Sequence, residues 1–540
     1  MHGILASFIM LNRFRIISSD IYFWTLAIMA VSLPFFPKIL VVCQIILILN
    51  WILEGNIVLK LKQIRKRKSI LVFLAIYAAH ILWLLNTSDF KQAFTDLEMK
   101  LPLLILPIVI GTSKPIEYYR IRQIIKFFIL AVFVSTVISA LWIFNIIPSN
   151  ISDERNTLFI SSVRFSLFVV VCILCVLNWI IKGKKTIYQQ LDYILLCIWL
   201  VFFLVLLKSL TGIIILFVTA SLLIILFNKR IDNPFLKVGL AIFIFALPIF
   251  TISYIGNSID SYFEKDTLDS KNLKTVTING KPYTHDTKQW QTENGHYVWI
   301  NICAPELKKE WNKRSKISFD SLDIKNQPLN NTLIRYLTSK GLSKDSVGIW
   351  KLKPSDINNV ETGMTNYIFE NKWSLFPRIY EVIWEVEQYQ RNKDVNGHST
   401  TMRLVYMDIS WQFFKHNIWF GIAPGDIRDE YLKYYKTHET GIEPKRYHET
   451  HNQFLRFLTV FGILGFLIVM LGFILPPVFE KKWSVFYFVA AFIVIFLSFI
   501  NEDTIETQIG VTFVAYFYSL FLWGTESNEE LQTYGNSPQR

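Results

Sequence analysis

Long apolar segments constrain this chain more than any other feature. They lie at about 21–36, 39–53, 70–86, 101–112, 124–147, 158–181, 190–207, 211–228, 237–255, 454–475, 485–500 and 509–524. A helix rises 1.5 Å per residue, so about 20 apolar residues cross a hydrocarbon layer roughly 30 Å thick. The whole chain is 52% hydrophobic and 15% aromatic, far from the composition of a soluble domain. The sequence therefore predicts an all-α polytopic membrane protein with about twelve transmembrane helices.

The positive charges predict how these helices are oriented. The formal net charge of +13 could suggest a nucleic-acid partner, but the lysines and arginines form short clusters between apolar segments, such as 60–68, 114–126 and 182–185. Alternate loops carry these clusters, and the other short loops carry few. Positive loops stay on the cytoplasmic side of a membrane. We therefore expect both termini in the cytoplasm, residues 256–450 outside, and no nucleic-acid partner.

The segment 256–450 is too long for a simple connection, and its composition shifts to Asn, Lys, Asp, Thr and Trp. Asn279-Gly280 and Asn294-Gly295 are hairpin turn signals. We expect a large external α+β domain inserted before the tenth helix, made of a module at 256–370 and a loop at 371–450 with an amphipathic helix over 401–417. The flanking parts are then helices one to nine at 1–255, helices ten to twelve at 451–524, and a cytoplasmic tail at 525–540.

A polar cluster lies immediately before the tenth predicted span in the sequence. Its members are His448, Glu449, His451, Asn452 and Gln453. A histidine held at a bilayer surface can accept a proton near neutral pH, which makes this junction the predicted site. The alternative is an interfacial histidine that only bonds headgroups or loops. Two glycines in the span, at 462 and 465, predict close packing against another helix.

Three short motifs precede or contain this cluster in a fixed order. They are TTMRL at 400–404, the turn NIWFGIAPGD at 417–426, and HNQFL at 451–455 with GILG at 462–465. Together, in one external loop before a late span, they resemble the O-antigen ligase and polymerase family. These are enzymes of the bacterial inner membrane that use undecaprenyl-diphosphate-linked glycans.

The resemblance implies roles for particular residues. His451 is the expected base for the acceptor hydroxyl, and Arg403 is expected to bind the leaving diphosphate, since guanidinium forms bidentate bonds to phosphate oxygens. Asn452 and Gly425 belong to the matching motifs and are expected at the substrate. Arg403 could instead be a surface arginine on an amphipathic helix, and the turn at 421–426 could simply reverse the chain.

The second cation of the family is harder to place. In KSLTG, residues 208–212, Leu210 stands where the family carries a cation, so Lys208 or Arg164 is expected to replace it. Arg164 lies near the outer end of the sixth span, where an unpaired charge is costly, although it could also snorkel to the interface. Glu502 is expected to contribute to the site by orienting His451 or Arg403, and the alternative is a solvated acidic loop.

These expectations define a metal-independent, inverting membrane glycosyltransferase. The donor would be an undecaprenyl-diphosphate-linked glycan and the acceptor lipid A-core, as in an O-antigen ligase, while polymerases and protein O-oligosaccharyltransferases share the motifs. No Asp-x-Asp, Walker loop or dinucleotide fingerprint is visible, so no metal or cofactor is predicted. Alternatives from other classes are a polysaccharide transporter or flippase, which predicts charged pairs deep in the spans, and a structural protein that binds envelope polymers.

Overall fold

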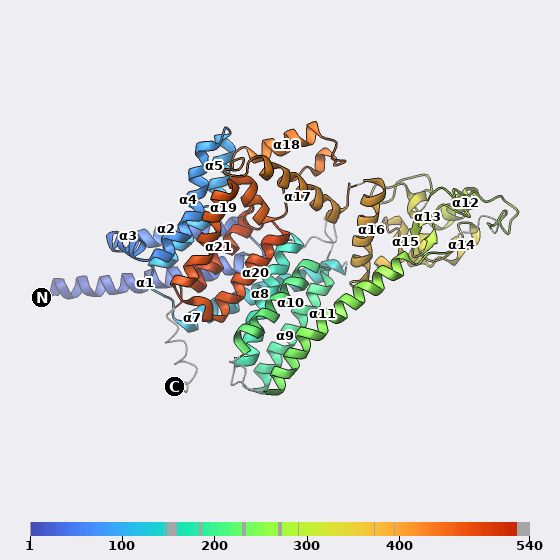
Figure 1. Ribbon diagram of the computed structural model, residues 1–540. Coiled ribbons are helices and arrows are strands. Elements are labelled where there is room, and N and C mark those ends of the chain that lie inside the picture. The colour runs from blue at the N-terminus through green and yellow to red at the C-terminus, as the bar shows by residue number, and fades with distance from the viewer. Residues whose placement is uncertain are drawn as a thin grey trace. The chain divides into compact units, whose positions relative to one another are not determined.

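The computed structural model describes residues 2–144, 146–147, 159–182, 186–228, 234–267, 273–289, 291–371, 373–393 and 395–525. Two compact units divide the chain. Unit 1 comprises Met1–Leu240 and Lys393–Arg540, and unit 2 comprises Ala241–Asn392 (Figure 1). Residues 148–157, between the fifth and sixth predicted spans, and all but the first residue of the predicted tail at 525–540 lie outside the described residues.

Unit 1 is built from helices. Its first part contains α1 (His2–Ser32), α2 (Pro37–Leu53), α3 (Ile57–Lys66), α4 (Lys68–Leu82), the 3-10 turn η1 (Trp83–Asn86), α5 (Phe90–Met99), α6 (Pro102–Thr112), α7 (Tyr118–Ile143), α8 (Ser162–Lys182), α9 (Ile187–Leu206) and α10 (Leu210–Phe227). Its second part contains α17 (Ser399–His416), α18 (Ile427–Thr437), η5 (Pro444–Arg446), α19 (Gln453–Phe479), η6 (Lys482–Ser484), α20 (Phe486–Asn501) and α21 (Gln508–Leu522). The predicted amphipathic helix over 401–417 is confirmed as a helix, α17.

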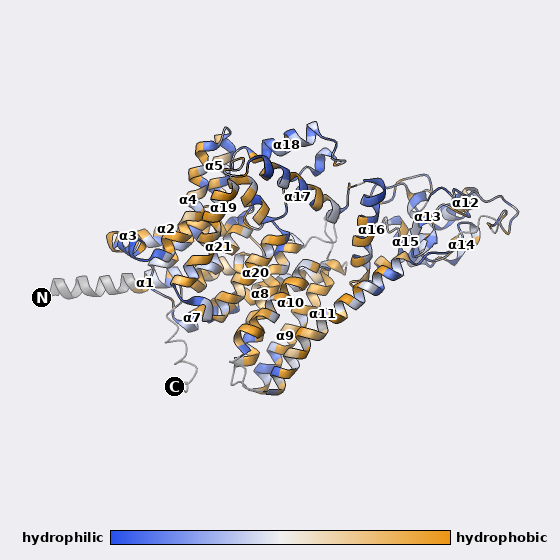
Figure 2. Ribbon diagram, in the orientation of Figure 1, coloured by the Kyte–Doolittle hydropathy of each residue, from blue (hydrophilic) through white to orange (hydrophobic). Residues whose placement is uncertain are grey.

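Among the described residues, 7 helices are long and apolar enough to cross a membrane, or up to 8 if α2 and α3, which meet at a 108° bend, form one span. Those 7 are α4 with η1, α7, α8, α9, α10, α19 and the Lys237–Phe263 part of α11 (Pro234–Phe263). The apolar helices at 16–32, α20 and α21 are shorter. Each predicted apolar segment contains a helix, and most of the long helices carry broad orange bands in Figure 2, whereas α18 is mainly blue. The protein is therefore a helical, multi-pass membrane protein, while the count of twelve spans stays a prediction.

α19 packs closely along α4, as its glycines predict. A Cβ added at Gly465 would lie 2.8 Å from Cζ2 of Trp83, and one at Gly472 would lie 2.5 Å from Cγ1 of Ile76. Both distances are too short for ordinary contact, so only glycine fits at these positions. The predicted close packing of the tenth span is confirmed at Gly465.

α19 is interrupted at Gly462, whose φ of 62° and ψ of −169° are not helical. Backbone groups of the loop before α18 form hydrogen bonds with the residues on both sides of this break. The amides of Ile422 and Ala423 donate to the carbonyls of Thr459 and Val460, each at 2.9 Å, and the amide of Ile463 donates to the carbonyl of Ile418 at 2.7 Å. Backbone groups at membrane depth need such partners because no water is present there. The break therefore joins the loop firmly to the span.

Unit 2 mixes short helices with a minimal sheet. It contains most of α11, β1 (Thr292–Glu293), β2 (His296–Tyr297), α12 (Ala304–Arg314), α13 (Leu329–Ser339), α14 (Ser346–Lys351), α15 (Pro354–Glu361), η4 (Tyr367–Glu370) and α16 (Phe376–Asn392). β1 and β2 pair antiparallel around Asn294-Gly295, where both residues have positive φ, so this predicted hairpin is confirmed. Buried Leu307, Trp311 and Leu333 belong to a hydrophobic core inside this unit.

Candidate functional site

The turn between α20 and α21 collects charged side chains from distant parts of unit 1. Glu502 begins this turn and is only 4% exposed. Its Oε1 lies 3.3 Å from Nη2 of Arg164, at the start of α8, and its Oε2 lies 3.6 Å from Nη2 of Arg403 on α17. Two arginines that are far apart in the sequence thus converge on one buried carboxylate. The alternative of a solvated acidic loop is wrong for Glu502.

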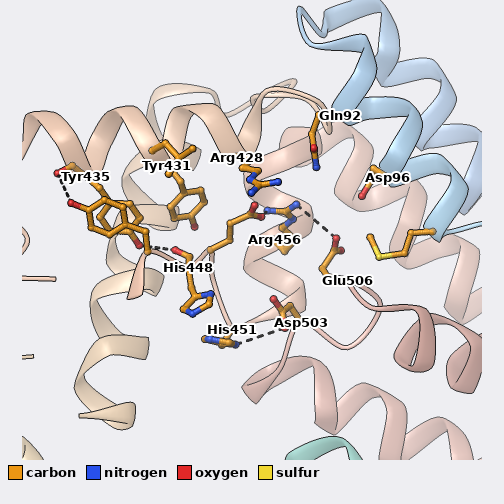
Figure 3. A pocket seen from close by; sticks show the side chains of 14 residues that line it. Gln92, Asp96, Arg428, Tyr431, Tyr435, His448, His451, Arg456, Asp503 and Glu506 are labelled. Atoms are coloured by element: carbon orange, nitrogen blue, oxygen red, sulfur yellow. Dashed lines mark hydrogen bonds and ion pairs between the residues drawn. The ribbon is translucent and has the colours of Figure 1, made fainter. Parts of the chain in front are cut away.

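His451 reaches the same turn from the start of α19. Its Nδ1 lies 3.7 Å from Oδ1 of Asp503, which is also 3.7 Å from Nη2 of Arg164 (Figure 3 shows His451 and Asp503). This separation is too long for a hydrogen bond, and Nδ1 has no hydrogen-bond partner in the part of the chain that the structure describes. The side chain of His451 is partly exposed.

Asn452 holds His451 in place. Its Oδ1 accepts from the amide of Leu455 at 2.8 Å and so caps α19, while its Nδ2 donates to the carbonyl of Ile500 at 2.8 Å. These two bonds tie the first turn of α19 to the last turn of α20. These bonds account for Asn452 without any ligand, and its contact with a substrate stays a prediction.

Burial raises the pKa of Glu502, and the neighbouring charge of Asp503 raises it further, while Arg164 and Arg403 oppose both effects. Desolvation also lowers the pKa of His448, and His451 adds to that effect. The carboxyl of Glu502 thus gains a proton more easily than an ordinary glutamate. Its ion pairs with the arginines are for the same reason easily released.

A second set of buried charges contacts the same turn. Its members are Asp96, Lys100, Glu449, Arg456 and Glu506, and we call this set the brace. Nζ of Lys100, almost fully buried, contacts Asp96 and lies 2.9 Å from Oε2 of Glu506. Arg456 on α19 contacts Glu449, and its Nη2 is 3.7 Å from the same Oε2 of Glu506. Burial would raise the pKa of Glu506, but Lys100 and Arg456 hold it below its usual range. The brace fixes the turn that carries Glu502.

Lys100 and Arg456 contact this turn but were not among the site residues predicted from the sequence. The signal that could have found Arg456 is an arginine inside an apolar span, because such a charge is costly unless it is paired. Lys100 offered a weaker signal, since it stands at the edge of an apolar segment next to a short polar helix. Their shared partner, Glu506, is on a distant part of the chain.

Gly425 lies where the PGD turn meets the segment between η1 and α5. A Cβ at Gly425 would be 2.3 Å from the carbonyl oxygen of Asp89 and from Oγ1 of Thr87. The next residue, Asp426, accepts hydrogen bonds from the amides of Ser88 and Asp89 at 2.9 and 2.8 Å. This close approach explains the glycine without any ligand, and a substrate contact of Gly425 stays a prediction.

Lys208 lies in the α9–α10 turn, partly exposed and with a positive φ of 52°. Gly212, just inside α10, approaches α8 so closely that a Cβ there would be 2.6 Å from Cβ of Ser166. The turn is therefore near the start of α8, which carries Arg164. Arg164 contacts Glu502 and Asp503 directly, whereas the role of Lys208 as second cation stays a prediction.

A cavity of about 460 Å³ opens beside His451 (Figure 3). Its wall carries side chains from α5, α18, the segment before α19, α19 itself and the α20–α21 turn. The lining residues are Gln92, Asp96, Met99, Arg428, Tyr431, Leu432, Tyr435, Tyr447, His448, Glu449, His451, Arg456, Asp503 and Glu506. The cavity is polar and aromatic, as a site for a hydroxyl-rich ligand requires.

On distance alone, three residues of the site could hold a metal ion. His451, Glu502 and Asp503 offer ligand atoms within 4.8 Å of one another. Carboxylate oxygens suit a hard divalent cation. Arg164 and Arg403, however, already lie against the same carboxylates, so a cation would have to compete with two fixed positive charges.

These features define a class: a helical, multi-pass membrane protein with cations, carboxylates and a histidine gathered where four helices begin or end. Residues 363–470 match the family model described as O-Antigen ligase. The match confirms the resemblance to the O-antigen ligase family seen in the sequence, over this region of the chain. The matched region contains Arg403, Gly425, His451 and Asn452. No curated protein matches the chain.

Proposed function

We propose that this protein transfers a glycan from undecaprenyl diphosphate to an acceptor hydroxyl at the outer face of the bacterial inner membrane. The observation that carries the proposal is the convergence of Arg164, Arg403 and His451 on the Glu502–Asp503 turn. Glycan transfer needs positive charge for a leaving diphosphate and a base for the attacking hydroxyl. Both kinds of group are present within one cluster.

In the proposed reaction, the acceptor oxygen attacks the anomeric carbon of the donor sugar, and His451 takes the hydroxyl proton. The bond from that carbon to the diphosphate oxygen breaks, and the diphosphate leaves with the electron pair. Arg403 and Arg164 stabilise the charge that develops on it, after exchanging Glu502 for phosphate oxygens. A single direct displacement inverts the anomeric centre and involves no metal ion.

The acceptor we propose is lipid A-core, which makes the protein an O-antigen ligase. An O-antigen polymerase and a protein O-oligosaccharyltransferase are alternatives with the same chemistry and a different acceptor. A polysaccharide transporter or flippase is the alternative from another class. The cluster at the helix ends favours an enzyme over this alternative, since a transporter needs polar groups near the bilayer midplane.

We further propose twelve spans, with both termini cytoplasmic and residues 256–450 periplasmic. Support comes from the end of α19 opposite to His451, where Glu480 pairs with Nε of Arg67 at 2.7 Å and Lys481 and Lys482 follow. Such a basic end is expected on the cytoplasmic side. A cysteine in place of Lys433 should react with an impermeant maleimide in intact spheroplasts, and one in place of Lys62 only after permeabilisation. The reverse labelling would contradict this orientation.

The function is tested by glycan transfer in a host that lacks its own ligase. His451→Ala and Arg403→Ala should accumulate lipid-linked donor and lose at least about tenfold in finished product, the effect expected for loss of a base or of a cation. His438→Ala and Arg65→Ala are matched controls on exposed residues and should behave like wild type. Membrane expression of all variants must be equal.

Two outcomes would contradict the proposal. If both site variants made a normal amount of finished product, His451 and Arg403 would take no part in the reaction. This result would favour the binding or transport alternatives. Donor that never reaches the outer face in the wild type would indicate a flippase. The molecule that carries the product distinguishes a ligase from a polymerase or a protein glycosylating enzyme.

A further inference from the structure

The two arginines of the charged cluster are not part of the lining of the cavity beside His451. His451 and Asp503 line the cavity, whereas Arg164, Arg403 and Glu502 do not. Arg164 and Arg403 meet at Glu502, and Asp503 joins that cluster to His451. A diphosphate held by the arginines would thus leave the cavity unoccupied. His451 would then face the diphosphate-linked sugar on one side and the cavity on the other.

Three tyrosines form much of the cavity wall. The rings of Tyr435 and Tyr447 stack with centroids 4.2 Å apart, and Tyr431 lies next to Tyr435. The hydroxyl of Tyr435 donates to the carbonyl of His448 at 2.6 Å, so this ring is held rigidly. Aromatic faces pack well against the apolar faces of a sugar ring. The volume is also within the range of about 300–1,000 Å³ usual for small-ligand pockets.

The two arginines that line the cavity differ in their ion pairs. Arg456 forms ion pairs with Glu449 and Glu506, so it belongs to the brace. Arg428, on the first turn of α18, is exposed and lines the cavity, and no ion pair involves it among the described residues (Figure 3). A guanidinium without a carboxylate partner can bind an anionic group of a ligand.

We propose that this cavity is the acceptor subsite. It takes the terminal sugar of the acceptor against Tyr435 and Tyr447, and Arg428 contacts an anionic substituent on the acceptor. The attacking hydroxyl then points to Nδ1 or Nε2 of His451, which receives its proton as the new bond to the donor sugar forms. The inference rests on the proposed transferase function and adds the side from which each substrate enters.

The test is two-substrate kinetics with the purified full-length protein in lipid nanodiscs. The donor is an undecaprenyl-diphosphate-linked glycan, and the acceptor probe is lipopolysaccharide that ends at the core. Arg428→Ala and Tyr447→Ala are compared with Lys433→Ala, a matched change on the exposed face of α18. In the first two variants we expect the KM for the acceptor to rise about tenfold or more, which is the size of effect expected when one good contact is lost. The KM for the donor should stay within about twofold of the wild-type value. Lys433→Ala should leave both values unchanged.

The possible failures are distinguishable. If the wild type transfers no glycan to this acceptor or to a second donor molecule, the proposed function fails and the subsite with it. If the wild type is active but the variants raise the KM for the donor, or change neither KM, the subsite proposal is overturned and the function stands. A core probe from which phosphates have been removed should bind wild type and Arg428→Ala equally, and a persisting difference would overturn the role of Arg428.

Discussion

At the scale of single residues, the site is a balance of charges around Glu502. One buried carboxylate is shared by Arg164 and Arg403, and Asp503 adds a second negative charge next to His451. A diphosphate would have to displace Glu502 from both guanidinium groups. Protonation of Glu502 removes that competition, and its raised pKa makes protonation easier than for an ordinary glutamate.

This balance predicts how donor binding depends on pH. As the pH falls through the raised pKa of Glu502, the neutral carboxyl releases Arg164 and Arg403, so the KM for the donor should fall. As the pH rises, the ionised carboxylate pairs with both arginines again, so the KM for the donor should rise. Measured from about pH 5 to about pH 8, the trend should disappear in Glu502→Gln, whose KM should stay near the low-pH value. An unchanged trend in this variant would show that another group titrates.

The buried brace makes a prediction about stability. Lys100→Met removes the cation that contacts Asp96 and Glu506, and leaving a buried charge uncompensated costs about 3–5 kcal/mol. Since Lys100 helps to depress the pKa of Glu506, its contribution is present at neutral pH and is lost as the pH falls and the carboxyl of Glu506 is protonated.

Thermal unfolding in detergent should therefore show a larger loss of Tm for Lys100→Met at about pH 7 than at about pH 4. The double variant Lys100→Met/Glu506→Gln should recover part of the loss, because one unpaired carboxylate is gone. Equal losses at both pH values, or no recovery in the double variant, would show that packing of the lysine stem matters more than its charge.

At the scale of elements, the break in α19 joins the loop after α17 to the membrane span. The loop 417–426 supplies backbone partners to both sides of Gly462, and Nε1 of Trp83 donates to the carbonyl of Phe420 at 2.6 Å. The same loop continues into the PGD turn that docks on Asp89. The helix that carries His451 and the loop after α17 thus form one rigid assembly within unit 1.

Gly462→Ala should disrupt this assembly. The new Cβ would lie 2.3 Å from the carbonyl carbon of Trp419, and the residue must also keep a positive φ. Gly55→Ala is the matched control, since Gly55 has a φ of +76° but nothing within 4 Å of an added Cβ. The control should lose only the roughly 1–2 kcal/mol of a left-handed alanine, and Gly462→Ala clearly more, measured by thermal unfolding and by glycan transfer. Equal losses would mean that the loop adapts to the extra carbon.

At the scale of the whole molecule, the chain is divided into two units with separate cores. Unit 2 buries Trp311 among helices α12 to α15 and holds its ends together through the hydroxyl of Tyr262, which donates to Oε2 of Glu387 at 2.6 Å. These contacts are all internal to unit 2. An inserted module with its own core can fold independently.

We therefore expect residues 256–392 to fold as a soluble fragment with cooperative unfolding. Trp311→Ala should destabilise the fragment by about 3–5 kcal/mol, the usual cost of a buried tryptophan. Trp350→Ala, at a residue that is 59% exposed, should cost much less. In the full chain, hydrogen exchange should show Trp311→Ala loosening unit 2 and leaving the α19–α4 contact protected. A fragment without a cooperative transition would contradict this independence.

The class of fold and the candidate site residues could be predicted from the amino-acid sequence. Apolar segments must form helices in a membrane, because their backbone groups have no other partners there, so each predicted segment contains a helix. Local motifs likewise pointed to His451, Arg403 and the glycines of α19, because a turn, a cap or a close approach depends on a few adjacent residues. The hairpin at Asn294-Gly295 was predictable for the same reason.

Which charged side chains pair with one another could not be predicted from the sequence and depends on how the helices pack. Arg164 and Arg403 come from two distant helices and meet Glu502 in the α20–α21 turn, while Lys100 and Arg456, from separate parts of the chain, both reach Glu506. A single sequence carries no signal for such pairing, because an arginine at the end of a span looks the same whether it snorkels to the interface or binds a buried carboxylate. Desolvation and Coulomb energy depend on the distances between these groups, and those distances exist only after the helices have packed.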